Sequence, residues 1–269
     1  MLVHAYAKIN LYLNVLGTLP NGYHEIESLM QSVGLCDDVS VRVEEAARFS
    51  ISLDPGRADL PADAGNLAWR AAEAMHARYH AERPERIDIR VTKRIPVAAG
   101  LAGGSADGAA VIAALCELWE REPDYELAAR LGADVPFCLA AQHGLPAAVA
   151  TGTGTELSPR MGEDFSVLLA TPAIAVPTAA VYRALREDDC RIRHSLETPG
   201  NHLQAPALRL FPQIRETLAW AEGLGAKRVQ LSGSGPTVFA LFARGEAPDL
   251  QTLQATAPAG TTLNLTECR

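Results

Sequence analysis

The part of the sequence best suited to chemistry is a glycine-rich stretch, residues 96–106, which reads Pro-Val-Ala-Ala-Gly-Leu-Ala-Gly-Gly-Ser-Ala. A predicted strand precedes it, and a predicted helix begins at Ser105. Glycine lets the backbone take positive φ and lets a ligand approach closely, while a helix start presents unpaired N–H groups at the positive end of its dipole. The stretch therefore predicts a phosphate site, with the Ser105 hydroxyl capping the helix or facing a phosphate or Mg²⁺. A turn that merely packs a helix on a strand is the alternative.

This stretch matches neither of two common nucleotide-binding sequences. It is not a Walker A loop, because no Gly-Lys-Ser/Thr follows, and it contains no G-x-G-x-x-G of a Rossmann fold. A second group of small residues, Ser232-Gly-Ser-Gly235, precedes a strongly apolar predicted strand. It could close over a phosphate, or it could be a plain turn into a buried strand.

Asp134 is the candidate acid–base residue. It stands among small and apolar residues in Leu131-Gly-Ala-Asp-Val-Pro136. A carboxylate there could act as a general base or as a metal ligand. An aspartate that only stops a helix or forms a turn would give the same local sequence.

The N-terminal segment places polar side chains at alternate positions of an otherwise apolar predicted strand: Lys8, Asn10, Tyr12 and Asn14. Alternation puts them on one face of the strand. That face either lines a cleft with Lys8 and Asn10 or is simply solvated. The segment Asn21-Gly-Tyr-His-Glu25 follows, and an aromatic ring beside a histidine suits stacking on a base, although buried packing is equally compatible.

Composition narrows the class of protein. At ~150 residues per domain, a chain of 269 residues predicts about two domains. A net charge of −8 excludes a broad surface for nucleic acid or an anionic membrane, so neither is expected as a partner. Five scattered cysteines without a C-x-x-C, and no apolar run of the ~18 residues of a membrane helix, indicate a soluble protein of the reducing cytoplasm.

Hydrophobic periodicity predicts the elements that must position these residues. In chain order they are strands near 39–43, 49–53 and 87–91, helices over 66–80 and 105–120, a strand at 165–170, helices over 178–186 and 211–223, and a strand at 237–242. Asn66 is a plausible N-cap, and His76 and His80 are expected on a solvated helix face rather than in a metal site. Strands and helices mix without strict alternation, so the predicted class is α+β, with a domain boundary in the stretch 143–163.

Taken together, these segments resemble the GHMP kinase superfamily from Ala5 to about Phe242. Residues 96–106 are similar to its glycine-rich ATP loop, and Ser232–Val238 to its third motif. The other pieces that carry the resemblance are Ala7-Lys-Ile-Asn-Leu11, Asn21-Gly-Tyr-His-Glu25, Leu131-Gly-Ala-Asp-Val-Pro136, Val176-Pro-Thr178 and Asn201-His-Leu203.

The resemblance implies a two-domain α+β fold with the active site in the cleft between the domains. An N-terminal ATP-binding and catalytic domain, residues 1–150, would resemble domain 2 of ribosomal protein S5. A C-terminal domain, residues 151–269, would be ferredoxin-like. The implied reaction is ATP-dependent phosphorylation, with Mg²⁺, of the 2-hydroxyl of a cytidine diphosphate conjugate of methylerythritol, a step of isoprenoid synthesis.

Residue roles follow from the same resemblance. Asp134 would be the catalytic base, Lys8 its partner, and Asn10 would help orient the reacting hydroxyl. The ATP phosphates would lie on the loop residues Pro96, Val97, Ala98, Ala99, Gly100, Leu101, Ala102, Gly103, Gly104, Ser105 and Ala106.

The substrate's base would occupy an aromatic clamp. Tyr23 and Tyr182 would sandwich the cytosine, His24 would read its polar edge, and Thr178 would lie near the ribose and diphosphate. A homoserine- or mevalonate-type kinase of the same superfamily would not need this clamp and is one alternative. A ligand sensor on the same fold is another, although Lys8 and Asp134 are both present.

Three residues depart from the family pattern. Ala102 replaces a usual glycine in the loop, and Ala106 replaces a residue that is often serine. We expect ATP binding to survive both changes, because backbone N–H groups do most of the binding. His202 stands where aspartate is more usual, and no role is predicted for it.

Overall fold

The computed structural model describes residues 1–20 and 22–269. Asn21, the first residue of the Asn21–Glu25 motif, lies outside the described residues. The strands are β1 (Leu2–Thr18), β2 (His24–Glu45), β3 (Ser50–Asp54), β4 (Glu85–Thr92), β5 (Ala147–Gly152), β6 (Glu156–Arg160), β7 (Phe165–Pro172), β8 (Arg228–Leu231), β9 (Val238–Ala243) and β10 (Thr261–Glu267). The helices are α1 (Leu67–Tyr79), α2 (Gly103–Leu118), α3 (Tyr125–Leu131), α4 (Val135–Gln142), α5 (Thr178–Arg183), α6 (Gln204–Leu210), α7 (Ile214–Glu222) and α8 (Leu250–Thr256), with a 3₁₀ turn η1 (Glu187–Cys190).

The chain forms two compact units that are not contiguous in sequence. The first unit comprises Met1–Ala7, Cys36–Val97 and Ala102–Leu145, and the second comprises Lys8–Leu35, Ala98–Leu101 and Pro146–Arg269. The chain passes from the first unit to the second for the last time between Leu145 and Pro146, within the predicted boundary stretch 143–163. A single boundary near residue 150 does not describe the other points at which the chain passes from one unit to the other. Strand β1, for example, has residues in both units, and its 17 residues, at ~3.3 Å each, are long enough for this. The assignment of ATP binding and catalysis to residues 1–150 stays a prediction.

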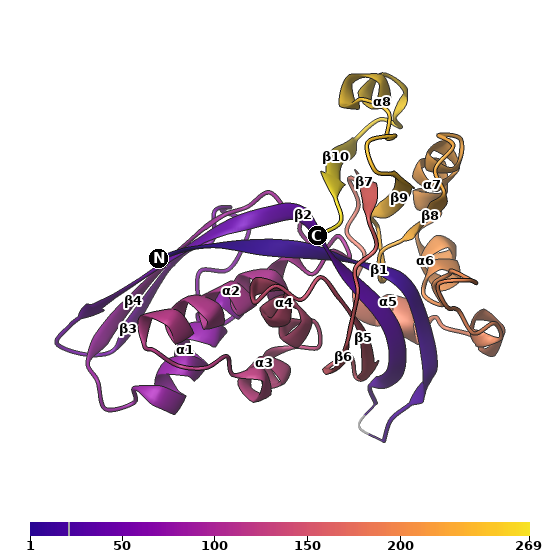
Figure 1. Ribbon diagram of the computed structural model, residues 1–269. Helices are drawn as coiled ribbons and strands as arrows, with labels where there is room; N and C mark the ends of the chain where they lie inside the picture. The colour runs from indigo at the N-terminus through magenta and orange to yellow at the C-terminus, as the bar shows by residue number, and fades with distance from the viewer. Residues whose placement is uncertain (21) are drawn as a thin grey trace. The chain divides into compact units, whose positions relative to one another are not determined.

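In the first unit, the predicted strands form a sheet around β4. It pairs antiparallel with the C-terminal half of β2, where Val41 faces Ile89, and parallel with β3, where Ile51 faces Ile87. Helices α1 to α4 lie against one side of these strands (Figure 1). Alternating valine and isoleucine supply the inward face, so the period-two pattern identified these three strands correctly.

Helix α1 begins as predicted, with Asn66 as its N-cap, whose side chain accepts a hydrogen bond from Ala68 N at 3.0 Å. The expected solvated face is wrong, because His76 and His80 are both buried. The His76 ring stacks on Phe49 with centroids 3.6 Å apart, and His80 Nδ1 lies 3.1 Å from the Glu85 carboxylate. Both histidines are therefore packed core residues.

The second unit contains two sheet regions. The N-terminal half of β2 pairs with β5, and β5 pairs with β6. Strands β5 and β6 lie in the stretch expected to be only a boundary, where glycine, proline and threonine obscure the alternation. The other sheet is antiparallel, in the order β10-β7-β9-β8. Helices α5 to α7 connect β7 to β8, and α8 connects β9 to β10, which gives the β-α-β-β-α-β arrangement expected of a ferredoxin-like domain.

The core of the second unit anchors β1. Leu13 and Val15 of β1 pack in one apolar cluster with Val181 of α5 and Leu218 of α7. His202 fixes the same strand: its Nδ1 accepts from Val15 N at 2.9 Å, and its Nε2 donates to a backbone carbonyl at 2.8 Å. His202, for which no role was predicted, is thus a buried clamp on β1.

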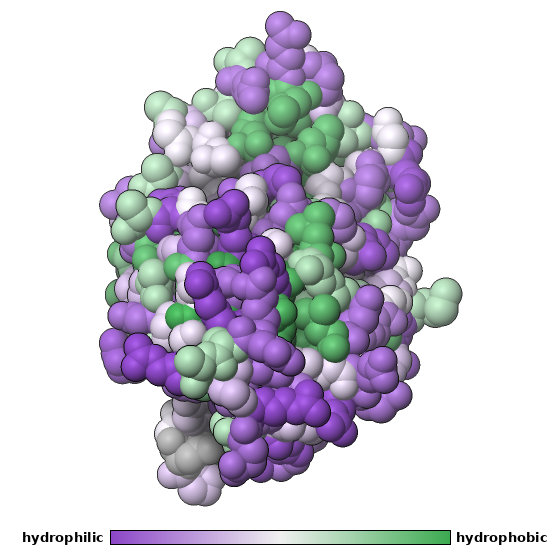
Figure 2. Space-filling model, turned by 90° about the vertical axis from the view of Figure 1, so that its left-hand side faces the viewer, coloured by the Kyte–Doolittle hydropathy of each residue, from purple (hydrophilic) through white to green (hydrophobic). Residues whose placement is uncertain are grey.

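The surface mixes hydrophilic and hydrophobic side chains, with hydrophilic ones prevailing on the face shown in Figure 2. Within residues 1–20 and 22–269, no helix has the length and apolar character needed to cross a membrane. None of the five cysteines, all of them within the described residues, forms a disulfide.

Candidate active site

Lys8 lies at the centre of a polar cluster in the second unit. Its side chain is buried, and its Nζ donates to Asn10 Oδ1 at 2.8 Å and to Gly100 O at 3.3 Å. Tyr12 and Asn14, further along the same face of β1, are buried as well. The polar face of β1 is therefore not a solvated sheet face.

The middle of the glycine-rich loop contacts both β1 and the turn Ser232–Gly235. Gly100 takes φ +76, and its carbonyl also accepts from Ser232 Oγ at 2.9 Å. A Cβ at position 100 would lie 2.1 Å from Ser232 O, so only glycine allows this approach. The glycine-rich loop 96–106 and the turn Ser232–Gly235, which are far apart in sequence, thus meet at the Gly100 carbonyl.

The turn Ser232–Gly235 reaches Lys8 directly. A Cβ on Gly233 would lie 3.4 Å from Asn10 Oδ1 and 3.7 Å from Lys8 Nζ. Asn201 holds the turn in place, because its Nδ2 donates to Gly233 O at 2.7 Å. We refer to Lys8, Asn10, Gly100 and this turn together as the Lys8 site.

Helix α2 begins earlier than the sequence predicted. Its first residue is Gly103 rather than Ser105, and the N-cap position is Ala102, in the left-handed conformation with φ +59. Ser105 is therefore the third helical residue and does not cap the helix. The chain enters the helix through Ala102, a position where glycine would carry less strain, which explains why a family would use glycine there.

The two glycines at the start of α2 face different surroundings. A Cβ on Gly103 would lie 2.9 Å from Ile95 Cγ2, inside the protein, whereas a Cβ on Gly104 would have nothing within 4 Å. Gly104 is exposed. The start of α2, in the first unit, is thus open to solvent at Gly104, and a helix start of this kind can bind an anion.

Asp134, also in the first unit, occupies the N-cap position of α4, and its side chain makes no capping hydrogen bond. It is half-buried, and Val135 and Pro136 beside it are buried. It therefore starts a helix rather than stopping one.

The residues predicted to bind the base lie in the second unit. The rings of His24 and Tyr182 are in contact, with centroids 4.8 Å apart and planes inclined by 32°, while Tyr23 is 65% exposed. Thr178 Oγ1 lies 2.9 Å from Ser234 Oγ. The structure thus joins His24 to Tyr182, and Thr178 to the Ser232–Gly235 turn.

A buried ionic cluster in the first unit was not predicted. Lys93 Nζ lies 2.5 Å from Asp37 Oδ2 and 2.8 Å from Asp107 Oδ2, and we call these three residues the Lys93 trio. Asp37 Oδ1 also accepts from the backbone N–H groups of Arg94 and Ile95, whereas Asp107 Oδ1 is buried without a hydrogen-bond partner. Asp107 lies one turn after Gly103 in α2, Asp37 lies on β2, and Lys93 directly follows β4. The trio therefore holds the start of α2 to β2 and to the end of β4.

Burial and charge act in opposite directions on the pKa values of Lys93 and Asp107. Burial lowers the pKa of Lys93, but Asp107 and Asp37 outweigh it and raise that pKa above its usual value of 10.5. Burial raises the pKa of Asp107 to about 7, against the opposing effect of Lys93. The buried Asp107 Oδ1, which has no hydrogen-bond partner, fits a carboxyl whose charged form is disfavoured by burial.

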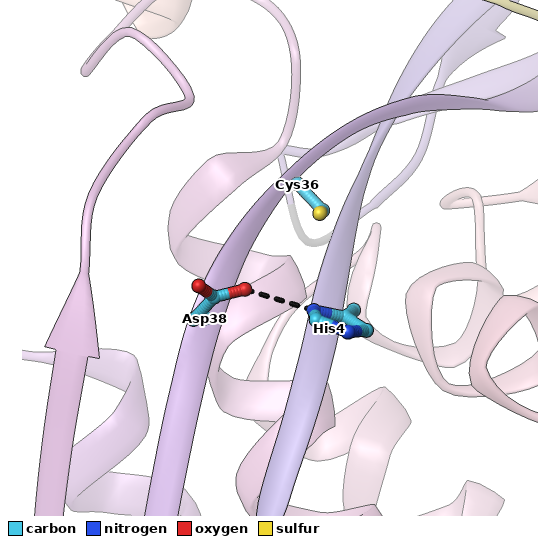
Figure 3. Close-up of side chains that lie close together, drawn as sticks. All are labelled: His4, Cys36 and Asp38. Atoms are coloured by element: carbon cyan, nitrogen blue, oxygen red, sulfur yellow. Dashed lines mark hydrogen bonds and ion pairs between the residues drawn. The ribbon is translucent and has the colours of Figure 1, made fainter.

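Two other features of the first unit contain none of the predicted site residues. A cavity of about 680 Å³ is lined by residues of the 54–62 segment and by Arg90–Lys93. His4, Cys36 and Asp38 place their ligand atoms within 4.8 Å of one another, and His4 faces Asp38 across β1 and β2 (Figure 3). Both Asp38 oxygens are already engaged, one by His4 at 2.8 Å and one by the cationic Arg94 at 2.5 Å, so we assign no metal to this group.

Comparison with known proteins identifies the class. Residues 66–150 match the family described as GHMP kinases N terminal domain, and residues 180–255 match GHMP kinases C terminal. The chain belongs to the GHMP kinase family and is a small-molecule kinase with the two-domain fold of that family. The predicted fold class and enzyme class are confirmed.

Several relatives carry one particular name. The 4-diphosphocytidyl-2-C-methyl-D-erythritol kinase of Mesorhizobium japonicum is 38% identical over 262 residues, which cover 90% of this chain and 86% of that protein. The enzyme of the same name from Mycolicibacterium gilvum is 39% identical, covering 91% and 83%. A crystal structure of 4-(cytidine 5'-diphospho)-2C-methyl-D-erythritol kinase superposes with a TM-score of 0.82 at 33% identity over 100% of both chains. Homoserine kinase from Cytophaga hutchinsonii shares the fold, with a TM-score of 0.68 at 16% identity, covering 98% and 94%.

Proposed function

We propose that the protein transfers the γ-phosphoryl group of ATP to the 2-hydroxyl of 4-diphosphocytidyl-2-C-methyl-D-erythritol, in the cytoplasm, during the synthesis of isoprenoid precursors. The observation that carries a kinase reaction is the Lys8 site, where a buried ammonium meets two glycine-rich segments. The named relatives, matched over about 90% of this chain, support the choice of substrate.

The ATP phosphates would lie on residues 96–106. Helix α2 has 16 residues, long enough for a full dipole, and its exposed start at Gly104 leaves room for an anion. Backbone N–H groups would supply most of the binding, so Ala106 needs no hydroxyl. An acidic protein can in this way hold a polyphosphate with few cationic side chains.

Mg²⁺ would arrive with ATP. Among the described residues, the loop region offers N–H donors rather than a group of three His, Cys or carboxylate side chains placed to hold an ion. This suits a metal that keeps several of its waters and binds mainly to substrate phosphates. Bound there, Mg²⁺ would offset charge on the β- and γ-phosphates, and no protein ligand is assigned to it.

Asp134, Lys8 and Asn10 would carry out the transfer. The acceptor oxygen forms a bond to the γ-phosphorus as the bond from that phosphorus to the bridging oxygen of ADP breaks, and Asp134 accepts the hydroxyl proton. Proton transfer of this kind is worth ~10²–10⁴-fold in rate. The Lys8 ammonium would stabilise charge on the transferring group, and the Asn10 amide would orient the hydroxyl.

The cytosine would bind between Tyr23 and Tyr182. His24 now rests against Tyr182, so it would turn to place a ring nitrogen at the edge of the base. Thr178, hydrogen-bonded to Ser234, would lie near the ribose and diphosphate. A kinase of the homoserine or mevalonate type has no base to clamp.

A coupled assay of ADP release tests the proposal, with the cytidylyl substrate compared against homoserine and mevalonate. We expect turnover with the cytidylyl substrate alone. Turnover of another acceptor instead would overturn the substrate assignment, and ATP binding without ADP release from any acceptor would favour a sensor. In the same assay, Asp134→Asn should retain ATP binding and lose ~10²-fold or more in kcat. A variant with wild-type kcat would exclude Asp134 as the base.

A further inference from the structure

Ser28, on β2, contacts the Lys8 site, although neither its type nor its spacing marks it in the sequence. Its side chain is fully buried. Its Oγ has two partners: it accepts from Asn10 Nδ2 at 2.8 Å and donates to Tyr12 O at 2.7 Å. Ser28 therefore joins the amide that contacts Lys8 to the backbone of β1.

The directions of these hydrogen bonds are fixed by chemistry. The Tyr12 carbonyl can only accept, so the single Ser28 proton is committed to it. Ser28 Oγ is then left as an acceptor, and only the NH₂ end of the Asn10 amide can donate to it. The oxygen end of that amide must consequently face Lys8, whose ammonium can only donate.

We propose that Ser28 is a positioning residue for phosphoryl transfer: it holds the Asn10 amide in the one orientation that presents Oδ1 to Lys8, and so sets where the ammonium points. The inference rests on the proposed function, because it takes Lys8 as the group that stabilises the transferring charge. Without the Ser28 hydroxyl, the Asn10 amide loses its anchor and can turn its NH₂ end toward the ammonium, which repels it.

Ser32 provides a matched control on the same face of β2. It is also buried, and its Oγ also donates to a backbone carbonyl, that of Pro146, at 3.3 Å. Ser32→Ala therefore removes the same kind of group from the same strand without touching Asn10. Any effect of a lost buried hydroxyl on folding alone should appear in both variants.

The test measures kcat, the KM for ATP and the unfolding midpoint for Ser28→Ala, Ser28→Thr and Ser32→Ala. We expect Ser28→Ala to lose about ten- to a hundredfold in kcat, as misplacement of a reacting group does, with little change in the KM for ATP. Ser28→Thr, which keeps the hydroxyl, should recover most of this loss, and Ser32→Ala should keep wild-type kcat. Equal kcat values for Ser28→Ala and Ser32→Ala would overturn the inference.

A second measurement does not depend on the substrate. In ¹⁵N-labelled protein, the Asn10 side-chain amide should exchange its protons slowly in the wild type and in Ser32→Ala, and faster in Ser28→Ala. Unchanged exchange in Ser28→Ala would also overturn the inference. If the wild type fails to release ADP with the cytidylyl substrate, the proposed function fails, yet the exchange rates still decide whether Ser28 orients Asn10.

Discussion

Two buried lysines, Lys8 in the second unit and Lys93 in the first, are held by different kinds of oxygen. Lys8 donates to an amide oxygen and a backbone carbonyl, whereas Lys93 donates to the carboxylates of Asp37 and Asp107. Neutral oxygens orient an ammonium without cancelling its charge. Carboxylates neutralise it in place, so the Lys93 trio suits a structural fastening and the Lys8 site suits chemistry.

Removing the Lys93 ammonium should give the largest effect on stability. Lys93→Met would leave Asp37 and Asp107 buried without their cation, and breaking a buried pair in this way costs about 3–5 kcal/mol of unfolding free energy. Denaturant unfolding of the variant measures this loss. Adding Asp107→Asn should restore part of it, because one of the two carboxylates is then gone. A double variant no more stable than Lys93→Met would show that the carboxylates are not the cause.

Removing the Lys8 ammonium should instead act on turnover. Lys8→Met should lower kcat by about 10²–10³-fold, equivalent to ~2.7–4 kcal/mol of transition-state stabilisation. The hydrogen bonds that it loses to Asn10 Oδ1 and Gly100 O involve neutral oxygens, so its unfolding free energy should fall by less than that of Lys93→Met. Steady-state kinetics and denaturant unfolding on the same preparations check the predicted loss of kcat and the predicted change in unfolding free energy. The comparison breaks if Lys8→Met is the less stable variant and retains kcat.

Two glycines of the loop, Gly100 in the second unit and Gly104 in the first, sharpen the contrast. Gly100→Ala puts a Cβ 2.1 Å from Ser232 O at φ +76, so we expect a loss of about 1–3 kcal/mol in stability together with reduced kcat. Gly104→Ala points into open space, so its stability should stay within about 0.5 kcal/mol while the KM for ATP rises. Thermal unfolding and ATP titration separate the two. A tolerated Gly100→Ala would contradict the close approach of loop and turn.

A further effect concerns pH and the Lys93 trio. The pKa of Asp107 is raised from 3.8 to about 7 by burial, so between these values the folded state keeps a proton that the unfolded chain releases. The unfolding free energy should therefore decline as pH rises from about 4 to about 7. Asp107→Asn has no proton to release and should flatten this decline. Unfolding curves at four pH values check it, and parallel profiles for variant and wild type would refute it.

The sequence predicted the parts of the fold that depend on local pattern. Val41 and Ile89 alternate with polar neighbours, and Asn66 caps the helix that follows it, so strands and a helix start could be recognised from adjacent residues. The start of α2 was misplaced because Gly103 and Gly104 have the composition of a loop although both are helical. Strands β5 and β6 were missed because their composition resembles that of a linker.

Sequence motifs could point only to those parts of the candidate site that stand in a motif. Lys8, Asn10 and the glycine-rich loop stand in recognisable sequences, and the structure places Lys8 and Asn10 beside Gly100. Lys93 is 56 residues from Asp37, so no local pattern joins them. Ser28 is a serine in a strand like any other, and its role depends on which atoms it meets. Contacts made through tertiary packing leave no local periodicity to detect.

The open space above Gly104 also gives the experimenter a labelling position. The native cysteines are buried or half-buried. Burial raises the pKa of Cys116 and that of Cys190 above the usual value, and it raises the pKa of Cys268 to about 11, which keeps these thiols protonated and slow to react. A thiol introduced by Gly104→Cys would be exposed at the start of a helix, where a thiolate is favoured. The rate at which a thiol reagent modifies it, with and without saturating ATP, would report whether nucleotide covers the start of α2, without any need for the acceptor substrate.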